Sequence, residues 1–456
     1  MQRISEALRS GDWLTRERVR LVAATLLFAS GAGFLYLVLT SHGAVDLQGR
    51  PLGTDFSNVY AAGTYVLDGN AAAAFDPVRQ YARERAIFGD TTQFYGWHYP
   101  PFFLFAAAAL ALMPYGLALA VWQAVTLGLY LLAIRAILTS SFRGPRSGNP
   151  ESIFPELETG APSTGPLKSW LWIPDSRFAA SGMTGEWLLV ALAFPAVLIN
   201  AGHGQNGFLT AALVGGALVL LDRRPLLAGI LFGLLVYKPQ YGLMLPLVLV
   251  ASGRWRCFAG AAATVVVLTI ATTLVFGASV WQAFFAFSEF TRTVVLEQGN
   301  TGWYKIQSVF AWARMWGAPV PLAYALQGAV ALALAGALVW LWRSAAAFPL
   351  KAAALCLGTI LATPYSLDYD MMVLAPAIAF LAADGFRRGF APWEKTALAA
   401  LWLVPLVARS VGEATLIPLG VPAMLTMFAL VLWRTGRDAA LPDLAKATAF
   451  SGASSR

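Results

Sequence analysis

Charge, cysteine and histidine are all scarce in this sequence. Charged residues make up 12% of the 456 positions, about half of the usual share in globular proteins, while hydrophobic residues make up 58%. Such a chain lacks the polar surface that a soluble domain needs. The two cysteines, Cys257 and Cys356, lie in or beside apolar segments without metal-ligand spacing, so we expect neither a disulfide nor a zinc site.

Apolar residues recur in blocks separated by short polar breaks. Because a helix needs about 20 apolar residues to cross a bilayer core of about 30 Å, the blocks predict an all-α integral membrane protein. Several blocks are shorter, which is typical of tilted or Pro-broken helices that neighbouring helices shield. The blocks are 21–40, 100–113, 116–138, 187–200, 206–221, 225–237, 239–251, 257–276, 321–342, 350–363, 371–383, 396–410 and 416–433.

The basic residues predict the orientation of these blocks. Lys and Arg fall in small groups at block ends, which is the pattern of cytoplasmic loops and argues against nucleic acid as a partner of this chain, whose net charge is +8. Both termini then lie in the cytoplasm, including a tail at 438–456, and an even number of spans is required. We therefore expect about 12 transmembrane helices in one polytopic membrane domain, 1–456.

Three segments between blocks have distinct characters. Residues 139–186 are rich in Pro, Gly and Ser and predict a flexible insertion. The first outer loop, 41–99, carries a helical pattern that starts at Asp55, and the Asp76-Pro77 pair predicts an N-cap followed by a second helix. Segment 277–320 also mixes aromatic with charged residues. We expect amphipathic helices at the outer interface in both, and a substrate with a lipid part and a polar part.

Asp55 is the first candidate for chemistry. A carboxylate at the outer membrane surface can act as a general base toward a sugar hydroxyl. The alternative is that Thr54 or Asp55 only caps the helix that follows, which the local sequence alone favours.

The other candidates are polar breaks at membrane depth, where ionisable groups are costly and informative. His98 and Tyr99 precede a Pro-Pro pair. His203, Gln205 and Asn206 form a second break, in which amides supply oriented hydrogen bonds, and Lys238, in a third, is placed to pair with a phosphate or to snorkel to the interface. The fourth break contains Tyr365, Asp368 and Asp370. Its Asp-x-Asp pattern is short and Asp370 can be a helix cap, so we expect no metal site.

Five of these motifs in this order resemble glycosyltransferase family 87. They are the Asp55-bearing segment that ends in Leu67-Asp68-Gly69, Tyr99-Pro100-Pro101, Gly204-Gln205-Asn206, Lys238-Pro239, and Thr363-Pro364-Tyr365-Ser366. The likeness runs from about 50 to about 385. It implies a GT-C-type helical bundle in a bacterial inner (cytoplasmic) membrane, with an outward-facing active site and a carboxylate in the first outer loop.

The resemblance also implies a chemistry. The donor is expected to be a hexose, mannose-like, on a polyprenyl phosphate, and the acceptor a glycan or glycolipid. No cofactor is expected. Asp55 is then the general base, with inversion at the anomeric carbon. A phosphate leaving group needs cations, for which Lys238 is the first candidate and His203, His98, Arg292 and Lys305 follow. This sequence departs from the family where Tyr365 to Asp370 replace a Trp and paired His, which leaves the sugar open.

Two other function classes remain at this stage. A transporter or flippase would line its pathway with the same polar breaks and use Asp55 only as a cap, although we find no internal repeat of the kind many transporters have. A purely structural membrane subunit is disfavoured by the number of convergent polar groups.

Overall fold

A computed structural model describes residues 2–142 and 179–453, with side chains for 2–140 and 185–440. Within these ranges the chain is helical, and the only β-type pairings are three isolated bridges. The expected insertion at 139–186 lies mostly outside the described residues. The expected tail at 438–456 starts inside α19, Gly420–Ala453.

Six helices in the described part of the chain are long and apolar enough to cross a membrane. They are Arg16–Thr40 (α2), Tyr115–Ser140 (within α6, Tyr115–Phe142), Trp255–Phe276 (α12), Val320–Arg343 (α15), Asp368–Arg388 (η7, Asp368–Val373, with α17, Leu374–Arg388) and Glu394–Thr415 (α18). A seventh span is formed if Gly185–Leu192, the end of α7 (Ala179–Leu192), is joined to α8, Pro195–His203, across a bend of 54°. The chain is therefore a multi-pass membrane protein.

The expected number of about 12 spans is not confirmed. Five apolar blocks form helices of only 10–17 residues: Pro101–Ala111 (η2, Pro101–Phe103, with α5, Leu104–Ala111), α9 (Gly207–Leu220), Pro225–Tyr237 (α10, Pro225–Leu234, with η3, Leu235–Tyr237), Pro239–Ala251 (η4, Pro239–Gly242, with α11, Met244–Ala251) and α16 (Phe348–Leu361). A helix of 14 residues is about 21 Å long, which falls short of a bilayer core. Several of these segments begin at proline or change to a 3-10 turn, so the block lengths in the sequence overstate the straight helix.

The loop between α2 and α6 folds into short helices, as expected. These are α3 (Phe56–Leu67), η1 (Ala71–Phe75) and α4 (Pro77–Phe88). The Asp76 side chain accepts hydrogen bonds from the backbone N–H groups of Val78 and Arg79, which confirms the predicted N-cap. Eight of the twelve α3 residues are buried, and α3 packs on α5, so protein covers the helix that the sequence placed at the lipid interface.

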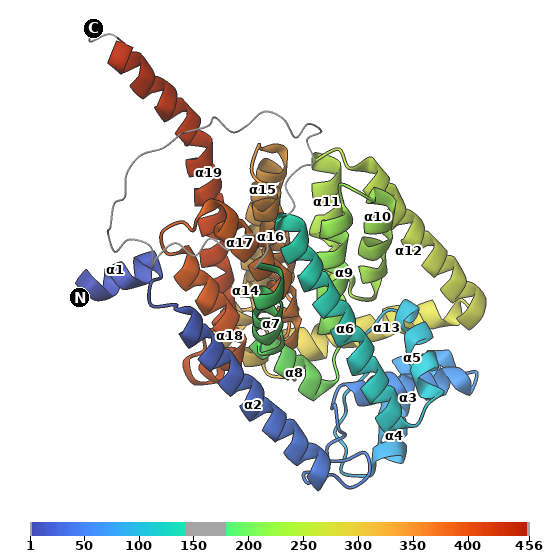
Figure 1. The fold of residues 1–456 in the computed structure, drawn as a ribbon. Coiled ribbons are helices and arrows are strands. Elements are labelled where there is room, and N and C mark those ends of the chain that lie inside the picture. The colour runs from blue at the N-terminus through green and yellow to red at the C-terminus, as the bar shows by residue number, and fades with distance from the viewer. Residues whose placement is uncertain (1, 143–178, 454–456) are drawn as a thin grey trace.

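Segment 277–320 is likewise helical, with α13 (Ser279–Phe290), a π-helix (η5, Thr291–Glu297), η6 (Trp303–Lys305) and α14 (Val309–Met315). Figure 1 shows α3, α4, α5 and α13 gathered at one end of the bundle, where α6 begins and α12 finishes. We call this the Asp55 end. The amphipathic helix α1 (Gln2–Ser10) lies away from it, against the start of α18: the backbone N–H of Trp393 donates to the carbonyl of Arg9.

Candidate active site

The Asp55 end joins the start of α3 to the end of α8. The backbone N–H of Asp55 donates to the carbonyl of His203, 3.0 Å away, and Thr54 Oγ1 lies 2.7 Å from His203 Nδ1. Gly204 permits this approach, because it has φ +64° and an added Cβ would lie 2.6 Å from the Cβ of Phe56. Two polar breaks that are about 150 residues apart in the sequence thus form one surface.

The Asp55 carboxylate does not cap its helix. No hydrogen bond runs from its side chain to the first turn of α3. Instead, Asp55 Oδ2 accepts a hydrogen bond of 2.9 Å from Gln205 Nε2. Asp55 is half-buried, and among the described residues its other oxygen has no side-chain hydrogen bond. The alternative reading as a simple cap has no hydrogen bond to support it.

Gln205 is itself held from two sides. Its Oε1 accepts hydrogen bonds from the Tyr99 hydroxyl, at 2.9 Å, and from the backbone N–H of Asn206, at 3.2 Å. Because the amide oxygen is fixed, the NH2 group must point to Asp55. The sequence named all these residues separately, and the structure brings them together in one hydrogen-bonded chain from Tyr99 through Gln205 to Asp55.

Lys238 lies in a different environment from the one expected. Its Nζ is 2.6 Å from Asp370 Oδ1, and Lys238 and Asp370 are only 5% and 3% exposed. Asp370 Oδ2 also accepts from the backbone N–H of Leu367, so Asp370 is a cap of η7, as the sequence had left open. A buried lysine neutralised in this way is poorly placed to serve a phosphate. Asn206 is also buried, and its Oδ1 has no partner among the described residues.

Asp368 is paired with a residue that the sequence reading missed. Arg409 of α18 contacts Asp368 Oδ2 through Nε at 2.7 Å and through a terminal nitrogen at 2.6 Å. Arg409 remains 39% exposed at its side chain. An arginine inside the apolar block 396–410 was the available signal, since charges at membrane depth are rarely without function.

Lys305 is brought to the same place by a short backbone pairing. The backbone N–H of Gln307 donates to the carbonyl of Ser366 at 2.7 Å, next to an antiparallel bridge between Ile306 and Leu367. Lys305 is half-buried, and among the described residues its ammonium has no hydrogen bond or ion pair. Burial and the neighbouring Arg409 lower the pKa of Lys305, and Asp368 and Asp55 oppose that shift.

The two remaining cation candidates, His98 and Arg292, differ from Lys305. His98 Nδ1 lies 3.0 Å from Thr291 Oγ1, and the ring packs against Phe287. Removal from water lowers the pKa of His98 to about 4, although the charge of Asp55 opposes this shift, so the imidazole is neutral at pH 7. Arg292 is exposed and pairs with Glu289 and, at 2.8 Å, with Glu297.

Glu84 is a second residue that the sequence reading did not single out. It lies on α4, is 0% exposed, and accepts hydrogen bonds from the backbone N–H groups of Tyr95 and Gly96 at 3.0 and 3.2 Å. A signal was present, because Gln80, Glu84 and Phe88 recur every four residues on one face of α4 and all three are buried.

The surroundings of Asp55 are compact. Several titratable groups from distant parts of the sequence lie within electrostatic range of its carboxylate: Glu84, His98, Tyr99, Lys305, Tyr365 and Tyr369. In the described part of the chain no three His, Cys, Asp or Glu side chains come together as metal ligands. Asp368 and Asp370 each face a cation of the protein instead.

The comparisons with known proteins agree with this picture. The sequence model of glycosyltransferase family 87 matches residues 97–364, more than half of the chain. No curated protein and no solved structure matches the chain. The match covers the Tyr99, Gln205 and Lys238 motifs and ends at Pro364, whereas Asp55 lies outside the matched range.

Proposed function

Because this chain belongs to glycosyltransferase family 87, and is therefore a membrane glycosyltransferase rather than a transporter, we propose which reaction its Asp55 end carries out. The protein transfers a mannose-like hexose from a polyprenyl-phosphate donor to a hydroxyl of a glycan or glycolipid, with inversion. The Asp55 end faces the outside of a bacterial cytoplasmic membrane, where lipid-linked donor and acceptor meet.

The orientation of Asp55 is the observation that supports this proposal most. Its carboxylate makes no capping hydrogen bond and accepts one from the Gln205 amide, while its other oxygen has no side-chain hydrogen bond among the described residues. A general base must be positioned within hydrogen-bond reach of the proton that it takes. The fixed amide donor supplies that position without neutralising the carboxylate.

The proposed reaction is a single displacement. The acceptor hydroxyl oxygen attacks the anomeric carbon of the donor, and its proton passes to Asp55. The bond between the anomeric carbon and the phosphate oxygen breaks at the same time, and polyprenyl phosphate leaves with the electron pair. Attack from the face opposite the phosphate inverts the anomeric configuration. No external acid is needed, because a phosphate ester leaving group is already a stable anion near pH 7.

The leaving phosphate requires a cation, and Lys305 is the proposed one. Lys238 is engaged by Asp370, Arg292 by two glutamates, and His98 is neutral. The Lys305 ammonium has no ion-pair partner among the described residues and lies within range of Asp55 and Arg409. Arg409 stands beside it and can share its exposed guanidinium between Asp368 and the phosphate. An oriented cation in a poorly hydrated site contributes several kcal/mol to developing charge.

The sugar is proposed to lie between the phosphate and Asp55. His203, Tyr365 and Tyr369 are half-buried near this space, with the rings of His203 and Tyr369 6.1 Å apart. Their ring faces and polar atoms suit the apolar faces and hydroxyls of a hexose. Tyr365 and Tyr369 stand where the family pattern has a Trp and paired His, so we expect the sugar preference to be set here.

The direct test uses purified protein in lipid nanodiscs with a radiolabelled polyprenyl-phosphate mannose and a membrane glycolipid extract as acceptor. We expect transfer by the wild type and a loss of at least about 1,000-fold in Asp55→Asn, which keeps the shape but removes the base. Asp68→Asn is the matched control, since it makes the same change at the exposed end of the same helix. Transfer by Asp55→Asn at the wild-type rate would contradict the assigned base. Transfer only from glucose- or galactose-bearing donors would contradict the sugar.

The orientation has its own test. Both native cysteines are buried, so single cysteines can be introduced at Glu413, near the Asp55 end, and at Asp222, near the other end. A membrane-impermeant maleimide added to intact cells should label the first and not the second. Labelling of the second alone would contradict an outward-facing site.

A further inference from the structure

Glu84 anchors the segment that leads from α4 into the candidate site. Residues 93–100 belong to no helix or strand, and the chain turns at Gly96, which has φ +65°. The backbone N–H groups of Tyr95 and Gly96 donate to the two oxygens of the Glu84 carboxylate, and Gln80 Nε2 approaches one of these oxygens at 3.4 Å. Because buried N–H groups must find acceptors, this carboxylate fixes where the segment runs.

The anchored segment carries a residue of the site. Tyr99 follows Gly96 by three positions, and the Pro100-Pro101 pair limits its backbone. The Tyr99 hydroxyl holds Gln205 Oε1, and Gln205 Nε2 holds Asp55 Oδ2. Gln80 links α4 to α3 directly as well, since its Nε2 donates to the carbonyl of Asn58 at 3.1 Å. A continuous series of contacts therefore runs from Glu84 to the Asp55 carboxylate.

The protonation state of Glu84 decides how many of these contacts form. The ionised Glu84 carboxylate accepts hydrogen bonds from the backbone N–H groups of both Tyr95 and Gly96. A protonated carboxyl group turns its O–H toward one of these N–H groups, and the hydrogen bond to that N–H is lost. Burial, opposed by the hydrogen bonds from Tyr95, Gly96 and Gln80 and assisted by the charge of Asp55, raises the pKa of Glu84 to about 7.

The charged and titratable groups that face Glu84 come from few elements. They are Asp55 at the start of α3 and Tyr95 in the segment itself; the ion pair of Arg50 with Asp46 acts on Tyr95 from the preceding loop. Burial and the Asp55 charge raise the pKa of Tyr95 to about 12, and His98 is neutral above about pH 4. Neither Tyr95 nor the nearby His98 therefore changes its charge near pH 7.

We propose that Glu84 is a positioning residue whose ionised form holds segment 93–100 and, through Tyr99 and Gln205, sets the Asp55 carboxylate for transfer. Loss of the Glu84 charge loosens this segment, so that transfer activity falls as the pH drops through neutrality. This inference rests on the proposed function for its kinetic consequence, but its structural part does not depend on the identity of the substrate.

The first test measures amide hydrogen exchange in the wild-type protein in nanodiscs, followed by mass spectrometry of peptides that cover 93–100. After correction for the intrinsic pH dependence of exchange, protection should fall about tenfold between about pH 8 and about pH 6, the loss of roughly one hydrogen bond. Glu84→Gln should show the low protection at both pH values, because its NH2 group replaces one acceptor. Asp90→Asn, the same kind of change at an exposed carboxylate just after α4, should behave as the wild type. Protection that is independent of pH in the wild type would overturn the proposal, even if Glu84→Gln failed to fold.

The second test follows the pH profile of sugar transfer. Glu84→Gln should lower kcat about tenfold at about pH 8 with little change in the KM for the donor, and the fall in activity around neutral pH should disappear. An unchanged kcat and pH profile would overturn the positioning role. Because exchange is measured without substrate, a failure of the proposed reaction leaves the exchange result standing, and the two failures can be told apart.

Discussion

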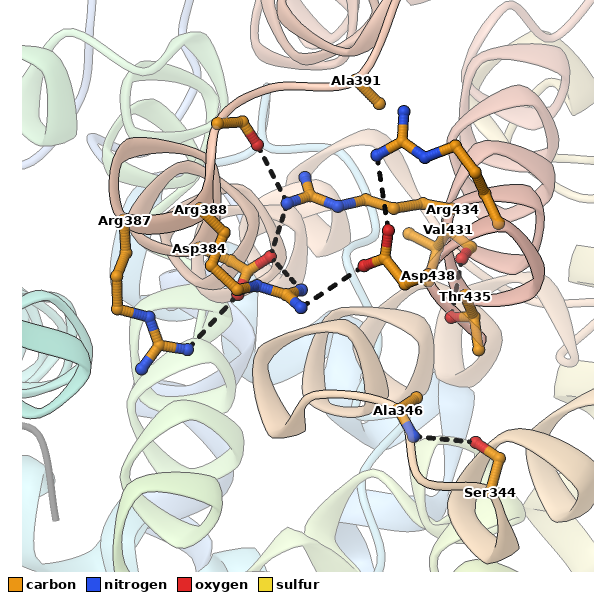
Figure 2. A network of polar contacts seen from close by, with 12 residues as sticks. Ser344, Ala346, Asp384, Arg387, Arg388, Ala391, Val431, Arg434, Thr435 and Asp438 are labelled. Carbon is orange, nitrogen blue, oxygen red and sulfur yellow. Dashed lines mark hydrogen bonds and ion pairs between the residues drawn. The ribbon is translucent and has the colours of Figure 1, made fainter. Parts of the chain in front are cut away.

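Charged residues are organised differently at the two ends of this bundle. At the Asp55 end, Asp55 is half-buried and held by a neutral amide, and the ammonium of Lys305 has no ion-pair partner among the described residues. At the other end of α17, Figure 2 shows Asp384 between Arg387, Arg388 and Arg434. Arg434 also contacts Glu394 of α18, and Asp384, Glu394 and Arg434 are all at most 3% exposed.

The difference separates two uses of charge in one chain. The Arg434 network neutralises buried carboxylates and joins α17, α18 and α19, so its charges stabilise the packing of these three helices. Among the described residues, Asp55 and Lys305 leave part of their hydrogen-bonding capacity unused, which does little for stability and which the proposed reaction would use. The two regions lie at opposite ends of the span that η7 and α17 form, because η7 carries Asp368 and Asp370, and Asp384 lies near the end of α17. Variants should therefore affect either folding or transfer, depending on the end in which they lie.

The largest stability effect is expected in the Arg434 network. Arg434→Met leaves Asp384 and Glu394 buried without their shared cation, which should lower the free energy of unfolding by about 3–5 kcal/mol. Thermal unfolding in nanodiscs measures the change. Arg387→Met is the control, since Arg387 is exposed and pairs with the same Asp384, and should cost at most about 1 kcal/mol. Similar losses of unfolding free energy in Arg434→Met and Arg387→Met would contradict the structural role given to the buried Arg434 network.

Lys238 tests whether a charge near the site can nevertheless be structural. Lys238→Met leaves Asp370 buried and unpaired and should destabilise the protein by about 3 kcal/mol. The double variant Lys238→Met with Asp370→Asn should recover part of this loss, because the buried charge is gone. We expect a coupling free energy of about 1–3 kcal/mol in a double-mutant cycle. A stable Lys238→Met with impaired transfer would instead assign Lys238 to the substrate.

Lys305 should show the opposite behaviour. Lys305→Met is expected to lower kcat/KM by roughly 100-fold, because it removes a cation from the leaving phosphate, while the unfolding temperature hardly changes. Arg292→Met makes the same kind of change at an exposed, already paired cation and should alter transfer by no more than a few fold. Equal effects of the two variants would contradict the role given to Lys305.

The smallest expected effect is on the stability of Asp55→Asn. A helix cap contributes about 1 kcal/mol, but the Asp55 side chain makes no capping hydrogen bond. Its substitution should therefore change the free energy of unfolding by less than about 0.5 kcal/mol while it abolishes transfer. A loss of 1 kcal/mol or more, in the same thermal unfolding experiment, would return Asp55 to the role of a cap.

The sequence predicted which residues belong to the candidate site better than it predicted the hydrogen bonds between them. Asp55, Tyr99 and Gln205 were each identifiable as polar residues at breaks between apolar blocks, and the order of the motifs indicated the family, which the family match confirms. The chain of hydrogen bonds between these residues was not predictable, because no local sequence pattern indicates which polar break packs against which other one in the fold. The same limit explains why Arg409 and Glu84 were missed, since each is only one charged residue in a helix until its partner is known.

Composition alone determined that this chain is helical and lies in a membrane, because 58% hydrophobic residues in recurrent blocks permit no soluble fold. It did not determine how many blocks are complete spans, since prolines and 3-10 turns shorten several helices without changing their hydropathy. The tertiary structure alone decided which charges are free. Lys238 and Lys305 are both lysines near the candidate site. Asp370 pairs with Lys238 and makes it structural, whereas Lys305 has no ion-pair partner among the described residues.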